Sequence, residues 1–149
     1  MLRRLKNLGA SSENLLDVYI KQIRCVLELA ASAWQGSITL VEKKDLERVQ
    51  KCALAIILGK SYSSYDHALK ILGLDTLDAR RNKLSLKFAL KAEKHPKFKN
   101  WFIPEFKKAN TRSTCNKYKE VRSNHERYQR SPLSFLTSLL NDHYKNVNS

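Results

Sequence analysis

Apolar residues recur every three or four positions through most of this chain, which is the spacing of one buried face of an α-helix. The longest series predicts a helix over residues 12–34 whose apolar face would be the spine of the core. Shorter series predict helices over residues 2–8, 40–58, 65–72, 77–94 and 132–144. No stretch alternates apolar and polar residues as a half-buried strand does. The sequence therefore predicts an all-α fold, an irregular bundle of four to five helices with a short terminal helix.

Capping residues mark where these helices should begin and end. Thr39 and Glu42 have the spacing of a capping box, in which each side chain satisfies an unpaired backbone N–H group. The other expected N-caps are Ser11 or Ser12, Ser64, Thr76 and Ser131. The residues expected to end helices are Gly9, Gly36, Gly59, Gly73 and Pro96.

Composition divides the chain into three expected parts. Residues 1–106 hold most of the predicted helices and would form the bundle, with the aromatic residues after Pro96 folding back over its end. Residues 107–130 have few apolar side chains, so we expect a basic arm or linker that is extended or disordered until it meets a partner. Residues 131–149 would form the terminal helix.

Positive charge is concentrated in the second half of the chain. The whole sequence has 28 Lys and Arg against 14 Asp and Glu, a net charge of +14. Residues 79–149 alone hold 17 cationic and 5 acidic side chains. This asymmetry indicates a polyanionic partner, and it favours RNA or DNA over an anionic membrane surface.

The predicted helix over residues 77–94 carries a line of cations. At 100° per residue, five cationic side chains fall in one sector about 80° wide. These residues are Arg80, Lys83, Lys87, Lys91 and Lys94. They are expected to follow a phosphate backbone, and the alternative is a solvated helix face. Arg81 lies outside this sector among apolar residues, so we expect it to be buried and paired with a carboxylate or stacked on an aromatic ring.

Two later segments combine cations with aromatic residues. Lys97 and Lys99 precede Trp101 and Phe102, whose rings could stack on unpaired bases or close the core. The predicted arm is typical of a segment that becomes ordered on RNA or DNA, although a solvated tail remains an equal alternative. Its candidate nucleic-acid contacts are Lys117, Lys119, Arg122, Arg127 and Arg130, with Tyr118 and Tyr128 between them.

The sequence offers little for catalysis or metal binding. Cys25, Cys52 and Cys115 are an odd number without a close pair, which is typical of reduced intracellular thiols. The four histidines and Cys115 lack the spacing of a zinc site or of a catalytic pair. No signal peptide or membrane span is recognisable. We therefore expect no catalytic residue, metal, cofactor or membrane partner, and a nuclear or cytoplasmic protein.

Five motifs occur in order along nearly the whole chain. They are LKNLG at residues 5–9, LLDVYIKQIRCVLELAASAW at 15–34, LERVQKCALAIILG at 46–59, YSSYDHALKILGLDTLDARRNKLSLKFALKAEKHPKFKNWF at 62–102 and RYQRSPLSFLTSLLN at 127–141. In order and spacing they resemble the region after the palm in reverse transcriptases of non-LTR retrotransposons, the jockey-like and related elements of animals. Ser32 and Ser134 depart from this pattern, since such proteins often have proline there.

The resemblance implies a thumb-like helical module with a C-terminal tail, which in the parent enzyme grips the template and primer. It also implies that the palm, with its paired carboxylates for two metal ions, and the endonuclease are missing, and the palm would be a possible partner. No two aspartates are adjacent in this sequence. We expect a truncated, non-catalytic fragment whose Met1 is internal to a longer ancestral frame. Its exposed apolar area is expected at Leu2, Leu5 and Leu8 and on the long helix over residues 12–34. The alternative is a helical protein-interaction module whose basic charge serves solubility or an acidic protein partner.

Overall fold

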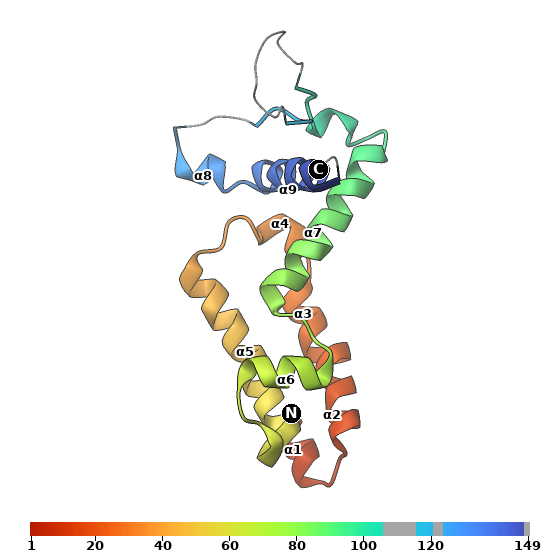
Figure 1. Ribbon diagram of the computed structural model, residues 1–149, viewed down its shortest axis with the longest axis vertical. Helices are drawn as coiled ribbons and strands as arrows, with labels where there is room; N and C mark the ends of the chain where they lie inside the picture. The colour runs from red at the N-terminus through yellow and green to blue at the C-terminus, as the bar shows by residue number, and fades with distance from the viewer. Residues whose placement is uncertain (106–115, 121–123, 148–149) are drawn as a thin grey trace. The chain divides into compact units, whose positions relative to one another are not determined.

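The computed structural model describes residues 1–105, 116–120 and 124–147 (Figure 1). These residues form helices and no β-strand, apart from one isolated antiparallel bridge between Pro104 and Tyr118. The prediction of an all-α fold is therefore confirmed.

Internal contacts divide the chain into two compact units. Unit 1 comprises Met1–Ala30 and Ile38–Arg81, and unit 2 comprises Ala31–Ser37 and Asn82–Ser149. Helix α7 (Leu77–Lys94) is continuous and contributes residues to both units (Figure 1). This division differs from the three parts expected from composition.

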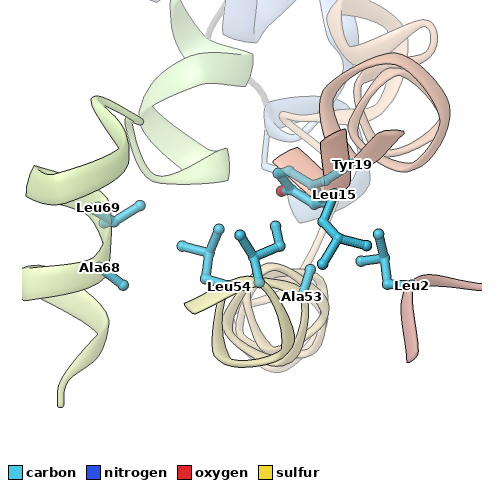
Figure 2. Close-up of a cluster of buried hydrophobic side chains, with 8 residues drawn as sticks. Leu2, Leu15, Tyr19, Ala53, Leu54, Ala68 and Leu69 are labelled. Carbon is cyan, nitrogen blue, oxygen red and sulfur yellow. The ribbon is translucent and has the colours of Figure 1, made fainter. Parts of the chain in front are cut away.

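Unit 1 is built around α5 (Leu40–Leu58), on which α1 (Leu2–Asn7), α2 (Ser12–Val18) and α6 (Tyr65–Leu72) pack. Its elements are α1 (Leu2–Asn7), α2 (Ser12–Val18), the π-helix η1 (Tyr19–Arg24), α3 (Cys25–Glu28), α5 (Leu40–Leu58), the 3-10 helix η2 (Gly59–Ser61), α6 (Tyr65–Leu72) and the start of α7. Figure 2 shows Ala53 and Leu54 of α5 between Leu69 of α6 and Leu15 of α2. These side chains are buried, so their apolar area provides the main stabilisation of unit 1.

A buried polar network joins the helices of unit 1. The fully buried Gln50 accepts a hydrogen bond from the Tyr19 hydroxyl at 2.6 Å and donates to the Tyr65 hydroxyl at 2.9 Å. Gln50 also donates to the backbone oxygen of Asp75 at 3.0 Å. Burial raises the pKa of both Tyr19 and Tyr65 above the ordinary tyrosine value. Both hydroxyls therefore remain protonated, and the network fixes η1, α5 and α6 to one another.

The expected helix ends are confirmed where the structure gives their geometry. Thr39 and Glu42 form the complete capping box, and the bonds from Thr39 lower the pKa of the Glu42 carboxyl. Gly73 ends α6 in a left-handed conformation with φ of 61°. The side chains of Ser11, Ser64, Thr76 and Ser131 accept backbone hydrogen bonds at helix starts.

The single helix predicted over residues 12–34 is wrong. After α3 the chain turns at Leu29, whose ψ is 126°, and Ala30 has a left-handed φ of 51°. Helix α4 (Ala31–Trp34) then begins in unit 2 and packs against α9 (Pro132–Val147). The local sequence has good helix formers here, so long-range packing overrides local propensity.

Unit 2 contains α4, most of α7, the 3-10 helix η3 (Lys99–Trp101), α8 (Glu126–Gln129) and α9. Its buried cluster comprises Ala89, Ala92, Phe102, Tyr118, Leu136 and Leu140. Gly36 approaches Phe135 so closely that an added Cβ would lie 2.5 Å from the Phe135 Cβ atom. Gly36 thus allows the end of α4 to contact α9, a role beyond the predicted helix break.

Two other expectations change in part. Leu2 is buried and Leu5 half-buried, so only Leu8 has the exposure expected of the N-terminal apolar residues. The short helix α8 lies within the arm that was expected to be extended or disordered. The rest of that arm is described only at residues 116–120 and 124–130, and its other residues lie outside the description.

Candidate nucleic-acid interface

Helix α7 has an inner and an outer face. Its buried residues are Leu77, Arg81, Ser85, Ala89 and Ala92, which follow one another at helical spacing. The exposed lysines of the same helix are Lys83, Lys87, Lys91 and Lys94. The apolar and small residues therefore determine which way the helix faces, and the lysines occupy the solvent side.

These four lysines line one hollow on the surface of unit 2. The hollow has a volume of about 320 Å³, and its described lining is completed by Leu86 and Leu90. No described residue of this lining is a carboxylate. In the described part of the chain, Lys87, Lys91 and Lys94 have no ion-pair partner. The arrangement is a shallow, open hollow on α7 with cationic sides and an apolar floor, here called the lysine groove.

Arg80 has the predicted angular position but a different environment. Its Nε atom lies 3.1 Å from Oε1 of Glu28, and the same carboxylate lies 3.3 Å from Nε of Arg24. Arg80 belongs to unit 1, whereas the four lysines belong to unit 2. Its guanidinium group is therefore engaged within unit 1 and is not part of the lysine groove.

Arg81 is fully buried, as its apolar neighbours in the sequence predict. Its Nη2 atom lies 4.0 Å from a carboxylate oxygen of Asp78. Burial lowers the pKa of the Arg81 guanidinium, and the negative charges of Asp78, Glu47 and Glu28 oppose this effect. The predicted pairing of a buried arginine with a carboxylate is confirmed.

Lys117 is held by the carboxylate of Glu93. The Lys117 Nζ atom lies 2.7 Å from Oε1 of Glu93 and 3.6 Å from the ring centre of Tyr144. The hydroxyls of Tyr118 and Tyr144 also donate to Glu93, the latter at 2.8 Å to Oε2. We call these four residues the Glu93 cluster.

The Glu93 cluster shifts the pKa values of its members. Burial alone would raise the pKa of Glu93, but hydrogen bonds from Lys117, Tyr118 and Tyr144 outweigh it and lower the value. Burial would lower the pKa of Lys117, but its bonds to Glu93 and Tyr144 raise it. Burial and the bond to Glu93 raise the pKa of Tyr118 to about 12. Lys117 is thus a paired structural cation in this conformation.

Sequence reasoning missed the role of Glu93, although one signal was present. Glu93 is the only acidic residue between positions 79 and 104 of the sequence. A second anchor was also missed: Asn141 exchanges two 2.9 Å hydrogen bonds with the backbone of Tyr118. Together Glu93 and Asn141 attach residues 116–120 to α7 and α9.

The other candidate contacts are dispersed over several elements of unit 2. Lys97, Lys119 and Arg127 are exposed, and Arg130 lies 3.7 Å from Glu126. The backbone of Lys99 belongs to η3, and Arg122 lies outside the described residues. The lysine groove brings four of the candidates, Lys83, Lys87, Lys91 and Lys94, into one hollow.

The aromatic residues after α7 have different exposures. Phe102 is 3% exposed within the core of unit 2, so its proposed stacking on bases is excluded in this conformation. Trp101 is 42% exposed, and its ring centre lies 4.7 Å from that of Phe98. Trp34, the last apolar residue of the helix predicted over residues 12–34, is half-buried.

Residues 1–105, 116–120 and 124–147 offer neither a metal-ion site nor a membrane-spanning helix. No group of three or more His, Cys, Asp or Glu side chains there could hold a metal ion. No helix in that part combines the length and the hydropathy needed to cross a membrane. Comparison of the chain with family models, with curated proteins and with solved structures finds no match.

Proposed function

We propose that this chain is a non-catalytic, thumb-like module that binds RNA or DNA through the phosphate backbone, without reading base sequence. The lysine groove is the observation that carries this proposal, because four cations line one hollow that has no carboxylate in its described lining. A solvated helix face would usually interleave acidic residues with the lysines.

The dimensions of α7 suit contact with successive phosphates. With a rise of 1.5 Å per residue, Lys83 and Lys94 are about 16 Å apart along the helix axis. Each lysine that approaches a phosphate releases a condensed counterion, which makes the affinity depend on salt. Lysine is a point charge on a flexible stem and does not distinguish between bases at the phosphate.

Filter binding with mixed-sequence RNA and DNA at two salt concentrations tests this function. We expect binding at low salt that weakens steeply as salt rises, with similar values for unrelated sequences. Absence of binding at low salt would contradict the proposal.

We also propose that the chain derives from the thumb and C-terminal region of a non-LTR retrotransposon reverse transcriptase. The order and spacing of the five motifs support this origin. The genomic sequence upstream of the Met1 codon tests it, since a frame continuing into a palm with paired aspartates is expected. Metal-dependent nucleotide incorporation by the purified chain is expected to be nil.

A protein-interaction module is the second candidate, favoured by exposed apolar side chains in unit 1. Val26, Leu29, Leu40 and Val41 are between 67% and 76% exposed. Where exposed apolar side chains form one contiguous area, that area is typical of a surface that meets another protein. Competition separates the two functions: polyglutamate should displace nucleic acid poorly if phosphate contact dominates, and efficiently if an acidic protein is the natural partner.

A further inference from the structure

The floor of the lysine groove is apolar and fixed in place. Leu86 and Leu90 line the hollow beside the lysines and also pack against the buried cluster of unit 2. Because both leucines are half-buried, part of each side chain remains accessible from the groove. A ligand that contacted the groove through phosphates alone would leave the accessible part of each leucine exposed to water. The groove therefore suits a ligand with apolar surface as well as negative charge.

A single nucleic-acid strand has both properties, whereas a duplex does not present them together. Base faces are stacked inside a duplex, and phosphates and sugars form its outer surface. An unpaired strand exposes flat base faces beside its phosphates, and side chains can cover those faces without regard to base identity. We infer that the lysine groove takes single-stranded RNA or DNA, with phosphates along the lysines and unpaired bases against Leu86 and Leu90. This inference rests on the proposed function.

Charge complementarity favours this ligand over an amphipathic acidic peptide. Lys83, Lys87, Lys91 and Lys94 succeed one another at intervals of four, four and three residues, about one helical turn each. A regular line of cations matches the regular line of phosphates in an extended strand. The excess positive charge of residues 79–149 would draw the same polyanion toward unit 2.

Fluorescence anisotropy with a labelled oligothymidylate tests the inference by competition. The competitors are an unlabelled oligothymidylate, a hairpin duplex with the same number of phosphates, and an abasic strand of equal length. We expect the unlabelled oligothymidylate to compete best and the abasic strand to resemble the duplex. The double variant Leu86→Ser and Leu90→Ser should lose about fivefold in affinity for oligothymidylate through lost apolar contact. Its affinity for the duplex should fall less than its affinity for oligothymidylate, and a native near-ultraviolet circular dichroism spectrum shows that the variant is folded.

Ile71→Ser is the matched control, because Ile71 is 52% exposed on α6, outside the groove. A gain variant, Leu90→Trp, should bind oligothymidylate more tightly than the native chain, with quenching of tryptophan fluorescence. Equal affinity for strand, duplex and abasic strand would overturn the inference and leave the proposed function intact. Preference for an acidic amphipathic peptide would also overturn it. Failure of every nucleic acid to bind at low salt would remove the proposed function and this inference together.

Discussion

The arginines and the lysines of helix α7 lie in different surroundings. Arg80 and Arg81 lie within 4.0 Å of carboxylates in unit 1. Lys87 and Lys91 of the same helix have no ion-pair partner among the residues described in unit 2. Helical spacing fixes the direction of a cation, whereas neighbours from other elements decide whether it stabilises the fold or remains available to a ligand. Both arginines should therefore act on stability, and the two lysines on binding.

The largest expected effect separates the adjacent arginines. Arg81→Met should lower the free energy of unfolding by about 3 kcal/mol, because it leaves the buried Oε2 atom of Glu47 without the neighbouring cation. Arg80→Met should cost less than about 1 kcal/mol, since its ion pair with Glu28 is partly exposed. Urea unfolding of both variants measures the difference. Equal losses would mean that burial does not distinguish the two arginines.

The second effect concerns the paired Lys117. Glu93→Ala should lower the free energy of unfolding by roughly 2 kcal/mol, because it removes the shared acceptor of Lys117, Tyr118 and Tyr144. Glu126→Ala is the matched control, since that carboxylate is 81% exposed beside Arg130 and should contribute almost nothing. Thermal unfolding with near-ultraviolet circular dichroism, which detects the tyrosines, compares the variants. The same loss in both would show that the Glu93 cluster has no special stability.

Acid should weaken the same cluster. The pKa of Glu93 is lower in the folded chain than its ordinary value of 4.5, so below that value the unfolded chain binds more protons. The stabilisation is therefore complete above pH 4.5 and is lost as the pH falls through the lower folded pKa. Glu93→Gln should flatten this part of the curve of unfolding free energy against pH. An unchanged acid limb in the variant would assign the loss to other carboxylates.

Substitution of a lysine in the lysine groove should affect nucleic-acid binding and leave the stability of the fold almost unchanged. Lys87→Gln should change the free energy of unfolding by less than about 0.5 kcal/mol, because the side chain is exposed and unpaired among described residues. Its affinity for nucleic acid should fall about fivefold at 0.1 M salt through one lost phosphate contact. Lys70→Gln on α6 is the control and should change neither quantity. A stability loss for Lys87→Gln without a binding change would reverse the assigned roles.

Much of the fold could be predicted from local chemistry. The capping box at Thr39, the left-handed end at Gly73 and the start of α9 after Ser131 depend on a few neighbouring residues, so the sequence contains their cause. The direction of the α7 lysines follows from helical spacing alone. The turn at Ala30 does not, because residues 31–37 pack in unit 2 with segments more than 40 positions away.

The candidate site divides in the same way. Spacing placed Arg80 beside the lysines but could not reveal its pairing with Glu28, which is 52 residues away. Likewise the sequence around Lys117 indicates an unpaired residue of the arm, whereas in the structure Lys117 contacts Glu93 and Tyr144. The sequence predicts the direction in which a helical side chain points, but it does not predict which side chains from distant elements will pair with it.

The most direct test compares two triple variants with the same net charge. Lys83, Lys87 and Lys91 become glutamine in one variant, and the exposed unit 1 residues Lys44, Lys60 and Lys70 become glutamine in the other. The slope of log affinity for single-stranded DNA against log salt should be about −3 for the native chain, if four lysines each meet a phosphate. The groove variant should reduce this slope to about −1, and the unit 1 variant should preserve it. Equal slopes in the two variants would show that overall charge, rather than the line of lysines on α7, governs the contact.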